Sequence, residues 1–98
     1  MERAERHMKL IIKVVEIKGP CPVYKKGDKI VFDEGYRLNL KETDAVCIHS
    51  LASVLPYYNA LYRGVPPEDM GLGEGYVQCL DPKKYTGGGT VTFKIKVE

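Results

Sequence analysis

Residues 90–98 read Thr-Val-Thr-Phe-Lys-Ile-Lys-Val-Glu, and this stretch decides the fold class. Apolar side chains occupy every second position, at Val91, Phe93, Ile95 and Val97. Strict period-two alternation is typical of an antiparallel strand with one face buried and the other face in water. We therefore expect a sheet that is covered on one face only.

A second long apolar stretch, residues 9–18, supplies the partner for this strand. Apolar residues on both faces of a strand predict a central position in the sheet or a bend at a β-bulge. The two stretches are the longest expected strands, and we expect them to pair at the sheet centre. The apolar residues of the first stretch are Leu10, Ile12 and Val14 on one face, and Ile11, Val15 and Ile17 on the other.

The middle of the chain predicts a helix. Thr43 or Asp44 is the expected N-cap, and Pro56 is expected to kink the helix or to open a second helical turn. Residues 57–63 continue helically, and Gly64 is the expected stop. Shorter strands are expected at residues 29–32, 36–40 and 76–80. The expected apolar face of the helix comprises Cys47, Ile48, Leu51, Val54 and Leu55.

This order of elements favours an α+β fold, in which a small antiparallel or mixed sheet carries one kinked helix or helical hairpin on a face. The chain has 98 residues, the size of one domain. We expect that domain at residues 9–98 and an N-terminal extension at residues 1–8.

Composition narrows the function classes. The chain shows no secretion signal and no apolar run long enough for a membrane helix, so no membrane partner is expected. An odd number of cysteines argues for a reducing cytoplasm without a disulfide framework. The net charge of +2 argues against nucleic acid as the main partner.

A set of short motifs resembles a family of small uncharacterised proteins of archaea and anaerobic bacteria. The resemblance covers nearly the whole chain from Lys9 onward. It implies a single domain and directs attention to the cysteines, and it carries no activity with it. The third cysteine of the family is usually followed by Pro, and Leu80 stands there in this chain. The motifs are Gly19-x-Cys21, Tyr24-Lys25-x-Gly27-Asp28, Cys47-Ile48-His49-x-Leu51, Leu55-Pro56 with Leu61 and Gly64, Cys79-x-Asp81-Pro82, and Gly88-Gly89-Thr90-Val91-x-Phe93.

The three cysteines, Cys21, Cys47 and Cys79, stand 26 and 32 positions apart, so they meet only if the fold brings them together. Structural zinc sites usually take two close pairs of ligands, and neither His7 nor His49 completes such a spacing. Free cysteine also packs as a small hydrophobe. Packing is the preferred interpretation, and a metal-binding or redox site built from the three cysteines is the alternative.

The expected environments of Cys47 and Cys21 differ. Cys47 is expected in the first helical turn, where backbone amides stabilise a thiolate. His49 would then lie about 200° around the helix from Cys47, so the two are not expected to form a dyad. Cys21, in a Pro-bounded loop, is the expected exposed thiol.

The remaining polar and glycine motifs have structural interpretations. Gly71–Gly75 and Gly87–Gly89 precede strands, so they are expected to be turns rather than phosphate-binding loops. Tyr58 and Tyr62 stand four residues apart, which indicates a core or interface position rather than a stacking surface for single strands. The carboxylates at marked sites, Asp28, Asp44 and Asp81, are expected to close turns or cap a helix.

The sequence therefore predicts a small binding or interaction module of unknown ligand. Exposed sheet edges or the tyrosine-rich helical surface would support a homo-oligomer or a protein partner. No catalytic residue or cofactor follows from the sequence, and a stand-alone enzyme is not expected. The alternative function is the thiol-dependent site.

Overall fold

The computed structural model describes residues 9–34, 36–81 and 83–98. The N-terminal extension expected at residues 1–8, including His7, lies outside these ranges. Within these ranges the chain forms a five-stranded antiparallel sheet in the order β3-β2-β1-β5-β4. This confirms the α+β class. The strands are β1 (Lys9–Lys18), β2 (Lys29–Asp33), β3 (Arg37–Leu38), β4 (Tyr76–Gln78) and β5 (Thr90–Val97).

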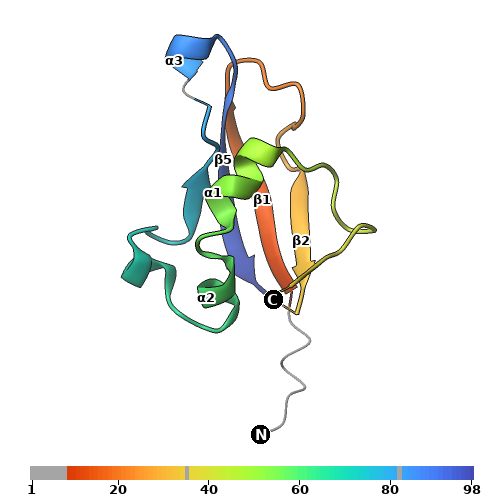
Figure 1. The fold of residues 1–98 in the computed structure, drawn as a ribbon, viewed down its shortest axis with the longest axis vertical. Coiled ribbons are helices and arrows are strands. Elements are labelled where there is room, and N and C mark those ends of the chain that lie inside the picture. The colour runs from red at the N-terminus through yellow and green to blue at the C-terminus, as the bar shows by residue number, and fades with distance from the viewer. Residues whose placement is uncertain (1–8, 35, 82) are drawn as a thin grey trace, which may run out of the picture.

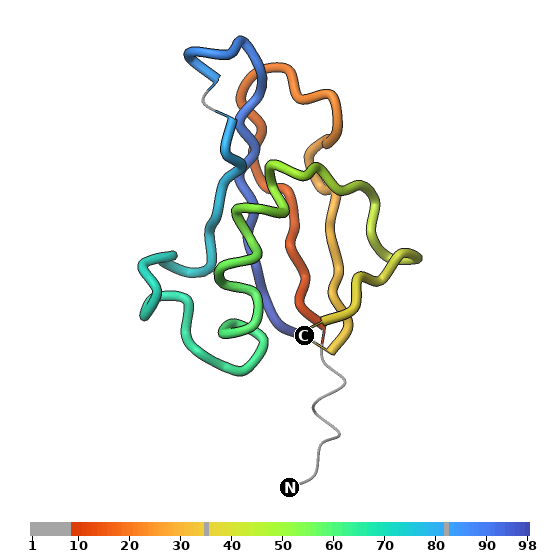
Figure 2. The backbone as a smooth tube through the Cα atoms, in the orientation of Figure 1, coloured from red at the N-terminus to blue at the C-terminus, as the bar shows by residue number. Residues whose placement is uncertain are grey.

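The two longest strands pair at the centre, as expected. Figure 2 shows the first and last strands of the chain side by side. A β-bulge between Val14 and Glu16 shifts the register of β1 against β5. Val14 faces Phe93 before the bulge and Ile17 faces Val91 after it, so Ile17 shares the face of Val14. The bulge explains the apolar residue at Ile17. Ile11 precedes the bulge and lies on the other face, where it pairs with the fully buried Val31.

Two short helices, α1 (Ile48–Val54) and α2 (Tyr58–Tyr62), cover one face of the sheet (Figure 1). The turn between them contains Pro56, which confirms a kinked helical layer. Gly64 follows α2 with a φ of 98° and ends the helix as expected. In the described part of the chain, no helix is long and apolar enough to cross a membrane.

Two details of the helix expectation are wrong. The N-cap is Cys47, because Thr43 and Asp44 bind the outer edge of β2 instead. Their side-chain oxygens accept hydrogen bonds from the Val31 and Lys29 amides, both at 3.0 Å. These contacts satisfy amides that β3, only two residues long, leaves unpaired.

The second detail is which face of the helix is buried, because it is not the face expected from the sequence. Ile48 and Leu55 are 80% and 49% exposed, whereas Ser50 and Val54 are fully buried. Because α1 begins one residue after Cys47 and breaks after Val54, its inner face is set by positions 50 and 54. The core lies between the helices and the inner sheet face. It comprises Leu10, Ile12, Val14, Tyr24, Ile30, Phe32, Val54, Leu61, Val77, Cys79, Val91, Phe93 and Ile95.

The loops hold short helical turns that the sequence did not predict. A 3-10 turn, η2 (Pro67–Met70), lies in the connection before β4, and α3 (Lys83–Thr86) lies between β4 and β5. The expected strands at 36–40 and 76–80 shorten to β3 and β4. The loop with α3 and the turn after β1 lie at the same end of the sheet (Figure 1), and this end positions the candidate site.

Candidate functional site

All three cysteines of the chain line one cavity of about 180 Å³. His49 and Asp81 also line it, and the remaining lining residues are Pro22, Val23, Tyr24, Gly89 and Val91. The cavity lies where the turn after β1, the start of α1 and the end of β4 meet. The fold therefore brings together residues that are far apart in the sequence.

Each thiol comes from a different element. Cys21 lies in the turn after β1, and its Sγ accepts the Tyr24 amide at 3.5 Å. Cys79 follows β4 directly, where the Val91 amide donates to its Sγ at 3.3 Å and the thiol donates to the Gly89 carbonyl at 3.6 Å. Cys79 is 6% exposed, and Cys21 and Cys47 are half-buried. Cys21, the expected exposed thiol, therefore shares its partial exposure with Cys47.

Cys47 differs from its expected environment. It precedes α1 as the N-cap residue and makes no side-chain capping hydrogen bond. The expected 200° separation from His49 assumed that both residues lie within one helix. The helix begins at Ile48, so only His49 lies within it, and both residues line the cavity.

Tyr24 fixes the base of the cavity through its hydroxyl. The Cys47 amide donates to the Tyr24 oxygen at 2.7 Å, and the Ser50 hydroxyl donates to the Cys47 carbonyl at 2.8 Å. The hydroxyl oxygens of Tyr24 and Ser50 are 2.6 Å apart. Because Ser50 has one proton to give, the Tyr24 hydroxyl donates to Ser50 and closes a ring of three hydrogen bonds.

The ring of Tyr24, unlike its hydroxyl, has an apolar neighbour. The Tyr24 ring packs edge-on against Phe93, with centroids 5.4 Å apart. Burial raises the pKa of the Tyr24 phenol above its usual value of 10.0, because the ionised form loses hydration. The phenol is therefore neutral at physiological pH and holds the N-cap segment of α1 in place.

The glycines of the 87–89 tract bring two walls of the cavity into contact. A Cβ on Gly89 would lie 2.8 Å from the backbone carbon of Pro20 and 2.9 Å from the Cys21 nitrogen. A Cβ on Gly88 would clash with the Asp81 carboxylate. The absence of side chains at these two positions lets the Cys21 turn approach the Cys79 strand. The structural interpretation of this tract is therefore supported by close backbone contacts.

Asp81 organises the adjacent turn. Its carboxylate accepts the Thr86 hydroxyl, and its carbonyl accepts the Thr90 hydroxyl at 2.9 Å. This agrees with the expected turn-closing role, although Pro82 lies outside the described residues. Within those residues, no group of three or more His, Cys, Asp or Glu side chains is placed to hold a metal ion. The cavity in this arrangement therefore offers individual thiols, an imidazole and a carboxylate.

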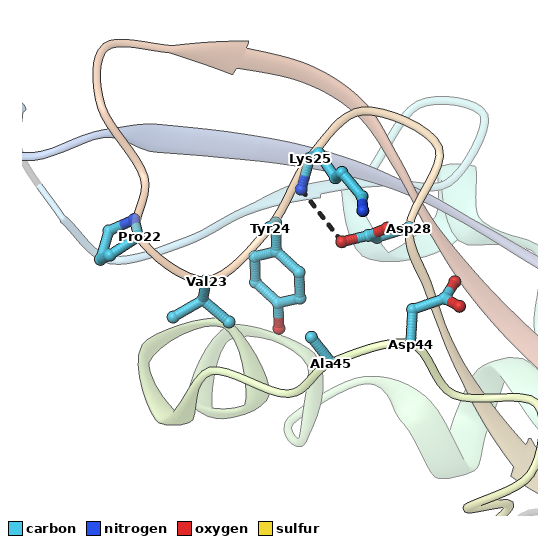
Figure 3. Close-up of a pocket in the computed structure, with 7 residues that line it drawn as sticks. All are labelled: Pro22, Val23, Tyr24, Lys25, Asp28, Asp44 and Ala45. Carbon is cyan, nitrogen blue, oxygen red and sulfur yellow. Dashed lines mark hydrogen bonds between the residues drawn. The ribbon is translucent and has the colours of Figure 1, made fainter.

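A second hollow lies beyond Tyr24 and shares Pro22, Val23 and Tyr24 with the cavity. Figure 3 shows Asp28 and Asp44 lining it. The Lys25 amide donates to Asp28 at 3.0 Å, which confirms the turn-closing role of Asp28. Asp44 accepts the Lys29 amide, so both carboxylates have structural partners. This hollow is therefore a weaker candidate than the thiol-lined cavity.

No family model, curated protein or solved structure matches the chain. The resemblance to small archaeal and bacterial proteins therefore stays a prediction. Sequence reasoning singled out the three cysteines and missed Tyr24 and Ser50 as parts of the site. Tyr24 appeared only within a motif of the resemblance, and Ser50 gave no signal because its role depends on a contact across 26 residues.

Proposed function

We propose that this domain binds a small ligand in the three-cysteine cavity. The observation that supports the proposal is the convergence of Cys21, Cys47 and Cys79 on one cavity with His49 and Asp81. Packing alone places cysteines anywhere in a core, whereas these three share a cavity although two of them retain solvent exposure.

The cavity limits the size and chemistry of this ligand. Pockets for drug-sized molecules usually measure about 300–1,000 Å³, and this cavity measures about 180 Å³. A molecule of a few heavy atoms fits, with an apolar, polarisable surface toward the thiols. His49 and Asp81 offer polar contacts to a hydrogen-bonding end of the ligand.

Competition between thiols tests the proposal. Native protein is first labelled at Cys21 with monobromobimane, and the alkylation rate of Cys47 is then followed by mass spectrometry. If both thiols open into one ligand cavity, the bimane slows alkylation of Cys47 by about tenfold, because a filled cavity excludes the second reagent. Only protein that carries the bimane at Cys21 and a free Cys47 is compared, and a Cys21→Ser protein that has not met the bimane gives the rate of Cys47 beside an unfilled cavity. Equal Cys47 rates with and without the bimane would contradict a shared cavity.

The metal-binding or redox alternative uses the same three cysteines. It is supported by the shared lining, and it requires side chains to move, because no ligand set is assembled in the described residues. Metal content of protein purified without chelator distinguishes the two. Stoichiometric zinc or iron that is lost in Cys79→Ser favours the alternative, and metal-free protein with intact competition favours small-molecule binding.

We also infer a cytoplasmic setting, where a reducing environment keeps such thiols free. The homo-oligomer or protein partner expected from the sequence stays a separate proposal. Its support is the exposure of Ile48 and Leu55 on the outer side of the helical layer. Sedimentation velocity over a range of protein concentrations decides whether the chain self-associates.

A further inference from the structure

The outer face of the sheet, opposite the helices, carries a row of lysines. Lys13 pairs with Lys29 across β1 and β2, and with Lys94 across β1 and β5. Lys94 pairs in turn with Tyr76 of β4. Because paired residues of antiparallel strands share a face, these four side chains form one row across four strands. Their inner neighbours, such as Val14 and Phe93, are buried, so the row points away from the core.

This row places like charges side by side, although Lys29 also interacts with the Glu42 carboxylate. Side chains directly opposite in antiparallel strands have Cβ atoms about 4.5–5.5 Å apart, and like charges there are destabilising. Among the described residues, Lys13 at the centre of the row forms no ion pair with an acidic side chain. Lys94 lies 3.6 Å from Glu74, a contact at the rim with a glutamate that is itself 75% exposed. A partner that carries regularly spaced negative charge would relieve this repulsion.

Tyr76 gives the row an aromatic end. Its side chain is 45% exposed, and the Lys94 ammonium lies 5.4 Å from the ring centroid. Adjacent strands are spaced about 4.8 Å apart, so the row from Lys29 to Tyr76 spans roughly 14 Å. A basic track beside an exposed aromatic ring is the arrangement with which proteins bind single-stranded nucleic acid, by phosphate contacts and base stacking.

We propose that this outer sheet face binds single-stranded nucleic acid. Phosphates contact Lys29, Lys13 and Lys94, and a base stacks on Tyr76. The weak net charge of the chain argued against nucleic acid, but net charge does not report the placement of three lysines in one row. An acidic peptide would satisfy the lysines but would not use the ring, so Tyr76 favours nucleic acid. This site is separate from the thiol cavity, which lies where the turn after β1, the start of α1 and the end of β4 meet.

Fluorescence anisotropy of a fluorescein-labelled oligo(dT) of about 12 nucleotides tests this site. We expect binding at low salt, with a slope of log affinity against log salt of about −2, since three phosphates are neutralised at about −0.7 each. Lys13→Gln lowers the affinity and reduces the slope by about 0.7. Tyr76→Leu lowers the affinity about fivefold or more and leaves the slope unchanged.

The chain offers a matched control in α3. Lys84 lies 5.6 Å from the ring centroid of Tyr85, a similar pair outside the lysine row. Lys84→Gln and Tyr85→Leu are expected to leave binding unchanged. Thermal unfolding excludes misfolding as a cause, because Lys13→Gln removes like-charge repulsion and is expected to keep or raise the midpoint.

Three outcomes overturn the proposal. The first is no binding of the oligonucleotide at low salt. The second is an equal loss of affinity in the Lys84→Gln control, which would show that binding is non-specific. The third is full competition by an oligo-aspartate peptide together with no effect of Tyr76→Leu, which would assign the row to an acidic peptide.

Discussion

The hydroxyl of Tyr24 is a single atom on which the geometry of the cavity depends. It accepts the Cys47 amide and contacts Ser50, while the ring packs against Phe93. Tyr24→Phe keeps the ring and removes these hydrogen bonds, so the Cys47 amide and the buried Ser50 hydroxyl each lose a partner. We expect a loss of about 1–3 kcal/mol in the free energy of unfolding.

Urea denaturation measures this loss. Tyr36→Phe provides the control, because Tyr36 is 74% exposed and its hydroxyl donates to the exposed Glu34 carboxylate at 3.2 Å. The control is expected to change stability by less than about 0.5 kcal/mol. Equal stability of Tyr24→Phe and wild type would contradict a structural role for the hydroxyl ring.

The raised pKa of Tyr24 predicts a dependence of stability on alkaline pH. The unfolded chain ionises this phenol near its usual value of 10.0, and the folded chain ionises it only at higher pH. Between these values the unfolded state has released a proton that the folded state keeps. The stabilising contribution is therefore complete below pH 10 and is lost as pH rises through the folded pKa.

The difference between wild type and Tyr24→Phe isolates this contribution from the other tyrosines and lysines. Urea midpoints are measured for both proteins from about pH 9 to pH 11.5. The wild type is expected to lose its advantage over Tyr24→Phe as the pH rises. Parallel curves at all pH values would show that the phenol ionises alike in both states.

The sequence could identify the cysteines but could not place them in one cavity. Their separations of 26 and 32 positions carry no geometric information without the fold. The angular argument for Cys47 and His49 took both residues as helical, and the first helical residue is Ile48. The sequence therefore shows which reactive side chains are present, but it does not show which of them lie close together in the fold.

At the scale of elements, the spacing of apolar residues predicted the strands and the faces that they bury. The alternation in β5 predicts the buried positions Val91, Phe93 and Ile95, whereas Val97 is half-buried. β1, which has apolar residues on both faces, contains a bulge. Thr43 and Asp44 fit the composition of an N-cap, but the exposed amides of β2 compete for the same side-chain oxygens. Tertiary contacts of this kind are invisible to local pattern, which explains why the start and phase of α1 were wrong.

The glycine tract before β5 allows an element-scale prediction. Gly89→Ala places a methyl group against the backbone of Pro20 and Cys21, at distances below 3 Å. The turn has to move away, so we expect a loss of about 1–3 kcal/mol in unfolding free energy. We also expect faster alkylation of Cys21 in the native protein, because the turn no longer packs on the strand.

Gly71→Ala is the matched control for this change. Gly71 has a φ of 78°, and a Cβ there would meet no heavy atom within 4 Å, so the substitution adds backbone strain without a steric contact. It is expected to cost about 1 kcal/mol and to leave alkylation of Cys21 unchanged. If the two variants alter the Cys21 rate equally, the close approach of Gly89 does not control the turn.

At the scale of the whole molecule, the centre of the sheet is made by strands from opposite ends of the described chain. β1 and β5 each have both edges paired, while β3 and β4 lie at the sheet edges. The sequence predicted this central pairing from strand length. It also predicted one wet face from the alternation in β5, but on that face Val31 of β2 is fully buried. It could not predict that the opposite face aligns three lysines, because that alignment depends on the register of three strands.

This arrangement predicts a gradient of local stability across the molecule. Hydrogen exchange followed by mass spectrometry should show the slowest amides in β1 and β5, whose opening requires unfolding of the whole sheet. The short elements α2, η2 and α3 should exchange faster, because each spans five residues or fewer. The cavity walls around Cys21 and Cys47 belong to turns outside the two central strands, so they can adjust to a ligand while the sheet stays folded. Exchange from the Cys21 turn as slow as from β5 would contradict this, since the cavity would then open only when the domain unfolds.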